Sequence, residues 1–353
     1  MTSQTKTIGL IGNPNCGKTT LFNALTRTRQ QVGNWPGVTV ERKSGVYGSG
    51  SSLVNVVDLP GVYSLGVTSF ASVDERVARE FALSGEADLV VNIVDASNLE
   101  RNLYLTAQII EMRVPMIVVL NMFDVAIARR LEIDVAGLSR RLGCPVVPMV
   151  ASRGEGLDDL KAEIARFGRE PHPPRATIKF APEIEAEIDA LQSALAASSV
   201  AGGIHDLRWL AVKLLENDEV ARHLVPAEML SAAEAAQARI TERLDEDADI
   251  LIADARYGFA NQIMRDLVRQ TGKVDRTTSD KIDRIVLHRV LGLPIFLLVI
   301  YLLFLFSINF GSAFIDFFDQ ITGAFLVDGV ASVLDGWGWP AWLVTLLAHG
   351  VGG

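Results

Sequence analysis

Cysteine and histidine are scarce in this sequence, and their spacing excludes two kinds of site. The 353 residues include two cysteines, Cys16 and Cys144, and neither belongs to a CxxC or Cys/His cluster. Spacing of this kind excludes a disulfide framework and a structural zinc site. The five histidines are scattered and are expected to be structural or solvated: His172, His205, His223, His288 and His349.

The chain also lacks an excess of positive charge and a secretory signal. There are 33 Lys and Arg residues against 42 Asp and Glu residues, so the formal net charge is −9 and the pI is about 5.2. A nucleic-acid-binding surface would need a clustered basic face, so no nucleic-acid partner is expected. The N-terminus, Met1–Lys6, is short and polar and leads into a strand pattern. We therefore expect the N-terminal domain to stay in the cytoplasm.

Short apolar runs alternate with helical patterns over residues 1–168. The runs expected as strands are Thr7–Ile11, Leu53–Val57, Leu89–Val94, Met116–Leu120 and Val146–Val150. The patterns expected as helices are Lys18–Leu25, Ser72–Leu83, Glu100–Met112, Val135–Leu142 and Leu157–Phe167. Apolar β-branched strands that alternate with helices are typical of a parallel sheet covered on both faces. The sequence therefore predicts an α/β domain with a mostly parallel sheet.

Composition changes after residue 168. The segment 169–176 holds three prolines, which cannot continue a helix, so we place a linker there. Residues 177–271 are rich in Ala, Leu, Glu and Arg, with apolar residues at helical spacing such as Ile184 and Ile188. This pattern predicts a small all-helical regulatory domain. A polar cytoplasmic linker is expected over 272–289.

An uncharged apolar stretch covers residues 290–310, which is about the ~20 residues that a helix needs to cross a bilayer. A buried core helix is the alternative, but such helices normally keep a polar stripe. Because Lys281, Arg284 and Arg289 precede the stretch, the positive-inside rule places the preceding domains in the cytoplasm. We therefore expect a cell inner membrane location and contact with the lipid bilayer. Residues 311–353 are expected to form an amphipathic or loop region and the start of a second, truncated membrane segment.

The clearest functional motif is a phosphate-binding loop. Residues 12–19 fit the pattern GxxxxGK[ST] between a predicted strand and a predicted helix, which is the context that supports this motif. Its glycines let backbone N–H groups surround phosphates, Lys18 reaches the β- and γ-phosphates, and the Thr19 hydroxyl ligates Mg²⁺. The nucleotide-binding residues expected here are Gly12, Asn13, Pro14, Asn15, Cys16, Gly17, Lys18, Thr19 and Thr20.

Two further motifs are expected on the phosphate side. Asp58 ends the second predicted strand and can hold Mg²⁺ through water, while the Gly61 N–H can sense the γ-phosphate. Thr39 lies in the loop between the two motifs, where it can ligate Mg²⁺ and touch the γ-phosphate when the loop is ordered. The nucleotide contacts expected in these motifs are Gly37, Val38, Thr39, Asp58, Leu59, Pro60 and Gly61.

The base is predicted to be guanine. Asp124 in the segment Asn121–Asp124 can accept the N1 and N2 protons of guanine, which adenine lacks, and Asn121 braces the loop. Met122 stands where the more familiar motif has Lys, so moderate affinity is expected. Backbone amides after the last strand can face the guanine O6, and the residues expected there are Val150, Ala151 and Ser152.

Hydrolysis needs a substitute for the glutamine that many GTPases carry after the motif glycine, because Val62 follows Gly61. We expect backbone groups of the switch loops to position the attacking water. Asn15 can coordinate a monovalent cation beside the phosphates and so supply the charge that an arginine provides elsewhere. The alternative for Asn15 is an Asx turn that stiffens the loop. The expected catalytic residues are Asn15, Lys18, Thr39 and Gly61.

Several segments together resemble the FeoB family of prokaryotic ferrous-iron transporters, and the similarity covers essentially the whole chain. They are GNPNCGKTTLFNALT, VGNWPGVTVERKSG, VVDLPGVYSL, NMFD and DKIDRIVLHRVLGLPIFLL. The resemblance implies a cytoplasmic G domain, a helical domain that influences GDP release, and a polytopic Fe²⁺ permease. Because nearly all of that permease is missing here, no residue of the iron path can be named.

The resemblance also implies individual roles. Asn15 matches a potassium-ligating asparagine, Gly33 and Trp35 match residues that offer backbone carbonyls to K⁺, and Thr39 matches the switch threonine. FeoA-like and FeoC-like accessory proteins are the implied cytoplasmic partners, and a homo-oligomer is left open. The order Ala151-Ser152 reverses the usual one in the fifth nucleotide motif.

Three functions remain in competition. The first is a GTPase module tethered to a ferrous-iron permease, in which GTP gates or powers uptake. The second is a membrane-anchored GTPase switch that transports nothing. The third is a P-loop kinase or general ATPase, which Asp124 disfavours because a guanine-reading aspartate has no use in an adenine site.

Overall fold

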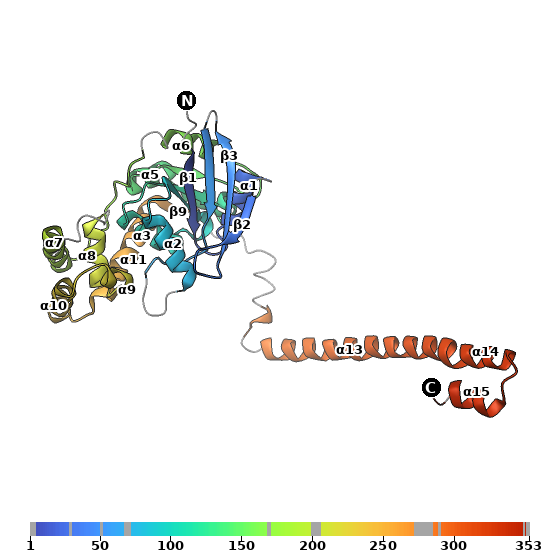
Figure 1. Cartoon of the computed structure of the whole chain (residues 1–353). Helices are drawn as coiled ribbons and strands as arrows, with labels where there is room; N and C mark the ends of the chain where they lie inside the picture. The colour runs from blue at the N-terminus through green and yellow to red at the C-terminus, as the bar shows by residue number, and fades with distance from the viewer. Residues whose placement is uncertain are drawn as a thin grey trace. The chain divides into compact units, whose positions relative to one another are not determined.

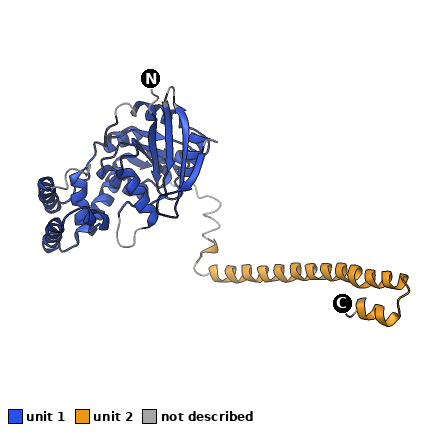
Figure 2. Ribbon diagram, viewed as in Figure 1, with its two compact units in different colours: residues 1–274 blue, residues 275–353 orange. Residues whose placement is uncertain are grey.

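The structure is a computed structural model of the chain. It describes residues 5–27, 30–49, 52–66, 72–167, 171–198, 206–271, 285–288, 291–348 and 350. The chain divides into two compact units, Met1–Val274 and Asp275–Gly353 (Figure 2). Most of the expected 272–289 linker lies outside the described residues, as do the histidines His205 and His349 and the basic residues Lys281, Arg284 and Arg289.

A seven-stranded sheet forms the centre of the first unit (Figure 1). Its strands, in spatial order, are β2 (Gln30–Asn34), β3 (Glu41–Ser49), β4 (Ser52–Asp58), β1 (Lys6–Gly12), β5 (Leu89–Asp95), β6 (Met116–Asn121) and β8 (Val146–Pro148). The pairs from β4 through β1, β5 and β6 to β8 are parallel, whereas β3 runs antiparallel to both β2 and β4. The prediction of a mostly parallel α/β sheet is confirmed.

Helices cover both faces of this sheet, because successive strand residues serve opposite faces. Leu10 of β1 packs in a core with α1 and α6, while Ile11 packs in a second core with α2 and α3. The helices of this part are α1 (Lys18–Thr26), α2 (Val73–Leu83), η1 (Ala96–Asn98), α3 (Leu99–Glu111), α4 (Phe123–Ala128), α5 (Val135–Leu142) and α6 (Leu157–Phe167).

The edge hairpin β2–β3 was not predicted, because its sequence carries no apolar strand pattern. All five residues of β2 are exposed, and Val32 keeps 63% of its surface. Pairing to β3 instead follows from backbone hydrogen bonds, in the register Val32 with Lys43. Strand signals from hydrophobic periodicity report burial, so an exposed edge strand gives none.

In the described parts of residues 171–271, five helices follow the sheet domain and gather on one side of it (Figure 1). They are α7 (Pro182–Ala197), α8 (Leu207–Leu215), α9 (Glu219–His223), α10 (Ala227–Leu244) and α11 (Ala248–Leu267). The predicted apolar face of α7 is buried, with Ile184 at 1% and Ile188 at 0% exposure. This arrangement confirms that a helical domain follows the sheet domain.

A short strand departs from the all-helical expectation. Residues Val268–Gln270 form β9, which pairs antiparallel with β7 (Leu131–Ile133) of the sheet domain. The Thr271 N–H then donates to the Arg130 carbonyl at 3.0 Å. The expectation of helix throughout 177–271 is therefore wrong at its end, because three-residue strands held by a distant partner have no pattern of their own.

The second unit contains one long apolar helix. It runs through α13 (Gly292–Thr322), the π-helical segment η3 (Gly323–Gly329) and α14 (Val330–Gly336), and a shorter helix, α15 (Ala341–Ala348), follows. The 45 residues from Gly292 to Gly336 have the length and composition that a membrane-crossing helix needs, and their most apolar window is entirely unburied. Residues 311–336 form helix and not a loop, because no proline or charge cluster interrupts the helix there, while the amphipathic alternative stays a prediction.

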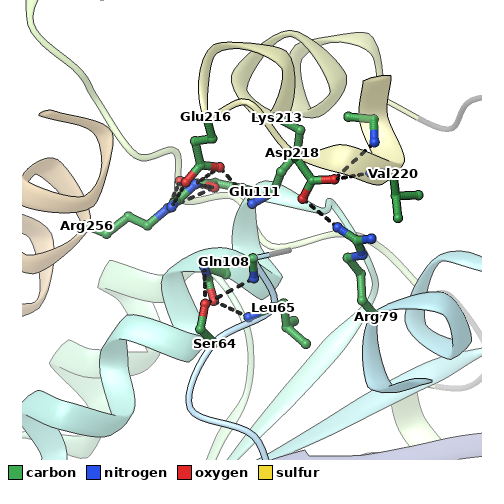
Figure 3. A network of polar contacts seen from close by, with 12 residues as sticks. Ser64, Leu65, Arg79, Gln108, Glu111, Lys213, Glu216, Asp218, Val220 and Arg256 are labelled. Atoms are coloured by element: carbon green, nitrogen blue, oxygen red, sulfur yellow. Dashed lines mark hydrogen bonds and ion pairs between the residues drawn. The ribbon is translucent and has the colours of Figure 1, made fainter. Parts of the chain in front are cut away.

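Buried ion pairs join the sheet domain to the helical domain (Figure 3). Arg79 of α2 lies 2.6 Å from the Asp218 carboxylate, and both side chains are 2% exposed. Asp218 also accepts the Val220 and Ala221 N–H groups at 3.0 Å and thereby caps α9. This carboxylate therefore contacts α2 of the sheet domain and caps the start of α9 in the helical domain.

A second group of ion pairs lies beside the first. Arg256 of α11 contacts both Glu111 of α3 and Glu216, while the Lys213 ammonium lies 2.7 Å from Glu216. Burial alone raises the pKa of Glu216. The charges of Lys213 and Arg256 lower it by more, so that the pKa is about 2. The buried guanidinium of Arg256 is balanced by Glu111 and Glu216, which raise its pKa despite its desolvation.

We predict that Asp218→Ala destabilises the folded chain by about 3–5 kcal/mol, because it leaves the Arg79 charge buried without a partner. Loss of the α9 cap adds about 1 kcal/mol. The measurement is urea unfolding followed by tryptophan fluorescence. The control is Arg222→Ala, which breaks an exposed pair to Glu234 at 3.0 Å and should cost less than about 1 kcal/mol. Equal losses for both variants would contradict the prediction.

Candidate functional site

The phosphate-binding loop joins the end of β1 to the start of α1, and two close approaches fix its path. Gly12 has no room for a side chain, because a Cβ there would lie 2.4 Å from the Ile93 carbonyl oxygen. Gly17 has a φ of 90°, and its Cβ would meet the Asn121 amide nitrogen at 2.1 Å. The loop can therefore pass close to both neighbours only with glycine at these two positions.

The side chains predicted to contact phosphate and Mg²⁺ converge below this loop. The Lys18 Nζ donates to Asp58 Oδ1 at 2.9 Å, and the Thr19 hydroxyl lies 3.4 Å from Asp58 Oδ2. The Lys18 and Asp58 side chains are only 11% and 7% exposed. The oxygen donors fit Mg²⁺, which takes one or two protein oxygens together with phosphate and water. The described residues hold no group of three or more His, Cys, Asp or Glu that would form a cage of their own.

The segment after Asp58 lies directly against the phosphate-binding loop. The Val62 N–H donates to the Gly12 carbonyl at 3.2 Å, and a Cβ on Gly61 would lie 3.2 Å from Pro14 Cα. Val62 itself is 2% exposed and packs in the core. Its apolar side chain therefore cannot orient a water, and the expectation that backbone groups take that role stays a prediction.

The same segment is tied to α3 farther along. The Leu65 N–H donates to the Gln108 side chain at 2.7 Å, and the Gln108 amide donates to the Ser64 hydroxyl at 3.0 Å (Figure 3). Gln108 lies three residues before Glu111, the partner of Arg256. The ties to the helical domain thus begin next to the segment that follows the Asp58 motif.

A buried tryptophan of the loop that carries Thr39 packs against α2. The Trp35 ring packs edge-on to Phe81 of α2 with centroids 5.5 Å apart, and the Arg42 guanidinium lies 4.5 Å above it. Gly33 lies exposed in β2, and Thr39 is exposed and makes no hydrogen bond among the described residues. No hydrogen bond joins Thr39 to Lys18 or Asp58 among the described residues, so its Mg²⁺ role stays a prediction, as do the K⁺ roles of Gly33 and Trp35.

Asn121 connects the phosphate side to the base side. Its amide nitrogen donates to the Cys16 carbonyl at 2.8 Å, and its oxygen accepts the Ala151 N–H at 2.9 Å. Met122 adopts a left-handed φ of 56° and turns the chain into α4, whose first turn carries Asp124. Asn121 thus braces two loops with one buried side chain, because it bonds the phosphate-binding loop and the loop that carries Ala151.

A residue absent from the sequence-based prediction lies beside Asp124. The Arg153 Nη2 is 3.5 Å from Asp124 Oδ2, and its Nη1 is 3.8 Å from the Glu155 carboxylate. Arg153 directly follows the predicted residue Ser152, so its position in the motif was the available signal. Only the folded loop shows which carboxylates it faces.

The two cysteines are poor nucleophiles. Burial raises the pKa of the Cys16 thiol to about 11, although Lys18 lowers it in part, and burial raises the pKa of Cys144 to about 12. Both thiols are therefore protonated at neutral pH and inert.

Four of the nucleotide motifs lie at the ends of parallel strands, at the carboxyl edge of the sheet, where such folds bind ligands, whereas the loop that carries Thr39 joins the antiparallel strands β2 and β3. The phosphate-binding loop follows β1, Asp58 ends β4, the Asn121–Asp124 motif follows β6, and the Val150–Ser152 loop follows β8. This order of elements defines a P-loop GTPase domain.

Comparison with known proteins specifies the family. The family model described as ferrous iron transport protein B matches residues 6–164, and that of the FeoB cytosolic helical domain matches residues 180–269. The Fe(2+) transporter FeoB of Salmonella typhimurium is 45% identical over 349 residues, and that of Escherichia coli K12 is 45% identical over 350. Each alignment covers 98% of this chain and 44% of the relative. The chain belongs to the FeoB family and spans about 44% of the length of these relatives.

Solved structures agree with this assignment. The cytosolic domain of L. pneumophila FeoB is 36% identical with a TM-score of 0.65 and covers 75% of this chain and 100% of that one. The GMPPNP form of the T. maritima FeoB cytosolic domain is 33% identical with a TM-score of 0.64, covering 75% and 99%. A GDP-bound mutant of the S. thermophilus FeoB G-domain is 36% identical with a TM-score of 0.68, covering 75% and 100%.

Proposed function

We propose that this chain binds GTP and hydrolyses it to GDP and phosphate. The observation that carries the proposal is the convergence of Lys18, Thr19 and Asp58 below a loop that Asn121 ties to the base side. Lys18 binds the β- and γ-phosphates, and the Gly61 N–H contacts the γ-phosphate. Asp124 accepts the N1 and N2 protons of guanine. The GDP and GMPPNP named for the related structures support a guanine nucleotide.

We also propose that side chains of the nucleotide motifs bind two metal ions, Mg²⁺ and K⁺. Thr19 and Asp58, joined by Thr39 when the switch loop closes, would hold Mg²⁺, which neutralises phosphate charge when bound. Asn15 has a left-handed φ of 64°, and its exposed side chain makes no hydrogen bond among the described residues. This geometry favours a K⁺ ligand over the alternative Asx turn, which would engage the Asn15 oxygen.

We predict that Asp124→Asn weakens GTP binding and favours xanthosine triphosphate. The substitution places an amide donor opposite the guanine N2–H₂, so one charged hydrogen bond worth about 1.5–3 kcal/mol is lost. Competition binding with GTP, ATP and xanthosine triphosphate measures the change. An unchanged nucleotide ranking would remove Asp124 from base recognition, and tighter ATP than GTP binding by the unaltered chain would favour the ATPase alternative.

We also predict faster GTP hydrolysis in potassium than in sodium, with the difference abolished by Asn15→Ala. The reason is that Val62 cannot orient water, so a cation held by Asn15 is left to offset transition-state charge. Phosphate release in the two chloride salts measures the effect, with nucleotide affinity determined in parallel. Equal rates in both salts would leave Asn15 with a structural role only.

We infer a regulatory role for the helical domain, 177–271, from its contacts with the sheet domain. Its Asp218 and Arg256 contact α2 and α3, the helices beside the second switch segment. Through these contacts, the helical domain restrains the movement of α2 and thereby influences the rate of GDP release. FeoA-like and FeoC-like accessory proteins and a second copy of the chain are the candidate partners for its outer surface.

At the level of the whole protein, the function supported best is that of the cytoplasmic GTPase part of a ferrous-iron transporter in the cytoplasmic membrane. The naming of the relatives as Fe(2+) transporters and the apolar helix from Gly292 support this assignment. The alternative is a membrane-anchored GTPase switch that transports nothing. Fe²⁺ is the transported substrate in the first case and has no role in the second.

We predict that these 353 residues associate with lipid vesicles through α13 and move no iron alone. A polar ion path must be shielded by several packed helices, and the described residues include one helix long enough to span. The assay uses liposomes that contain an Fe²⁺-chelating dye, with and without GTP. GTP-dependent uptake would contradict the prediction.

The matched control for this assay is a chain that ends before Val286. It should stay soluble and keep a similar GTP turnover, because the nucleotide motifs all precede residue 154. A 353-residue chain that is soluble without detergent would instead contradict the membrane assignment.

A further inference from the structure

Arg153 has no role among the nucleotide motifs, yet it lies at the base site. Its Nη2 lies 3.5 Å from Oδ2 of Asp124, the carboxylate that the proposed function assigns to guanine. A carboxylate that accepts the N1 and N2 protons of guanine uses both of its oxygens. The guanidinium therefore lies at an oxygen that a bound guanine would also use, so each partner weakens the interaction of the other with Oδ2.

The loop that carries Arg153 has little freedom. The Val150 N–H donates to the Glu155 carbonyl at 3.1 Å, and the Arg153 N–H donates to the Val150 carbonyl at 3.0 Å. Gly156 has a φ of 81°, and a Cβ there would lie 2.5 Å from the Pro148 carbonyl oxygen. The backbone of this tight turn therefore places the Arg153 side chain next to α4.

Exposure and charge favour an exchange of partners. Arg153 is 63% exposed and Asp124 is 34% exposed, so the guanidinium can move without disturbing the core. The Glu155 carboxylate, 3.8 Å from Arg153 Nη1, offers it a second partner within the same loop. Met122 stands where the more familiar motif has Lys, so Arg153 is the cation that the described residues place beside Asp124.

We propose that Arg153 competes with guanine for the Asp124 carboxylate and thereby sets the affinity and release rate of the nucleotide. Guanine displaces the guanidinium, which moves to Glu155. Departure of GDP returns the guanidinium to Asp124, so Arg153 speeds release and lowers affinity. This inference rests on the proposed GTP function. It makes Arg153 a positioning residue for the base-reading carboxylate.

The test measures the dissociation constant and release rate of a fluorescent GDP analogue with the 353-residue chain in detergent. Arg153→Ala should bind about two- to five-fold more tightly and release more slowly at low ionic strength, the range typical of an exposed ion pair. The difference should shrink at high ionic strength, because salt screens such pairs. Arg153→Lys, which keeps the charge, should stay close to the unaltered chain.

Two further variants separate competition from a general effect of charge. Arg140→Ala is the matched control, because Arg140 is 74% exposed and lies 3.8 Å from Asp134, outside the nucleotide motifs. It should leave affinity and release unchanged. In an Asp124→Asn background, measured with xanthosine diphosphate, Arg153→Ala should have no effect, because the carboxylate in competition is gone.

Three results would overturn the inference: weaker GDP binding by Arg153→Ala, unchanged affinity at low ionic strength, or the same effect in the Asp124→Asn background. Failure of the proposed function gives a different result. In that case the unaltered chain binds no guanine nucleotide at all. Normal GDP binding without an effect of Arg153 would reject only the competition.

Discussion

The nucleotide site depends on one buried side chain, that of Asn121 at the end of β6. Its amide spans the Cys16 carbonyl and the Ala151 N–H at 2.8 and 2.9 Å. The contact fits because Gly17 has no side chain, as a Cβ there would lie 2.1 Å from the same amide nitrogen. The phosphate-binding loop and the Val150–Ser152 loop are therefore joined through one side chain. A displacement of either loop changes a hydrogen bond that also positions the other.

The sequence predicted the interior of the fold better than its edge. Central strands such as β5 and β6 are buried on both faces, so their runs of apolar residues were readable. The β2–β3 hairpin and the β7–β9 pair are held by backbone hydrogen bonds and carry no such pattern. The predicted stretch 290–310 is only the uncharged part of the apolar helix, which continues past isolated acidic residues to Gly336.

Most of the candidate site was predictable because the carboxyl ends of parallel strands meet at one edge. That rule brought Lys18 to Asp58 without knowledge of distances. The rule does not predict contacts between side chains that lie far apart in the sequence and away from this edge. Arg79 and Asp218 are 139 residues apart, and nothing in either segment indicates the other. The contact of Trp35 with α2 was also beyond the pattern, because it depends on where a loop lies over a finished core.

The helical domain contacts the GTPase domain at both ends of the nucleotide site. On the phosphate side, Asp218 holds α2, the helix that follows the second switch segment. On the base side, β9 pairs with β7, which follows α4 and Asp124. Thr271, bonded to the Arg130 carbonyl, is the last described residue before the segment that leads toward the apolar helix. The last described residues of the first unit therefore belong to a strand that is anchored six residues beyond Asp124, not to a free helix end.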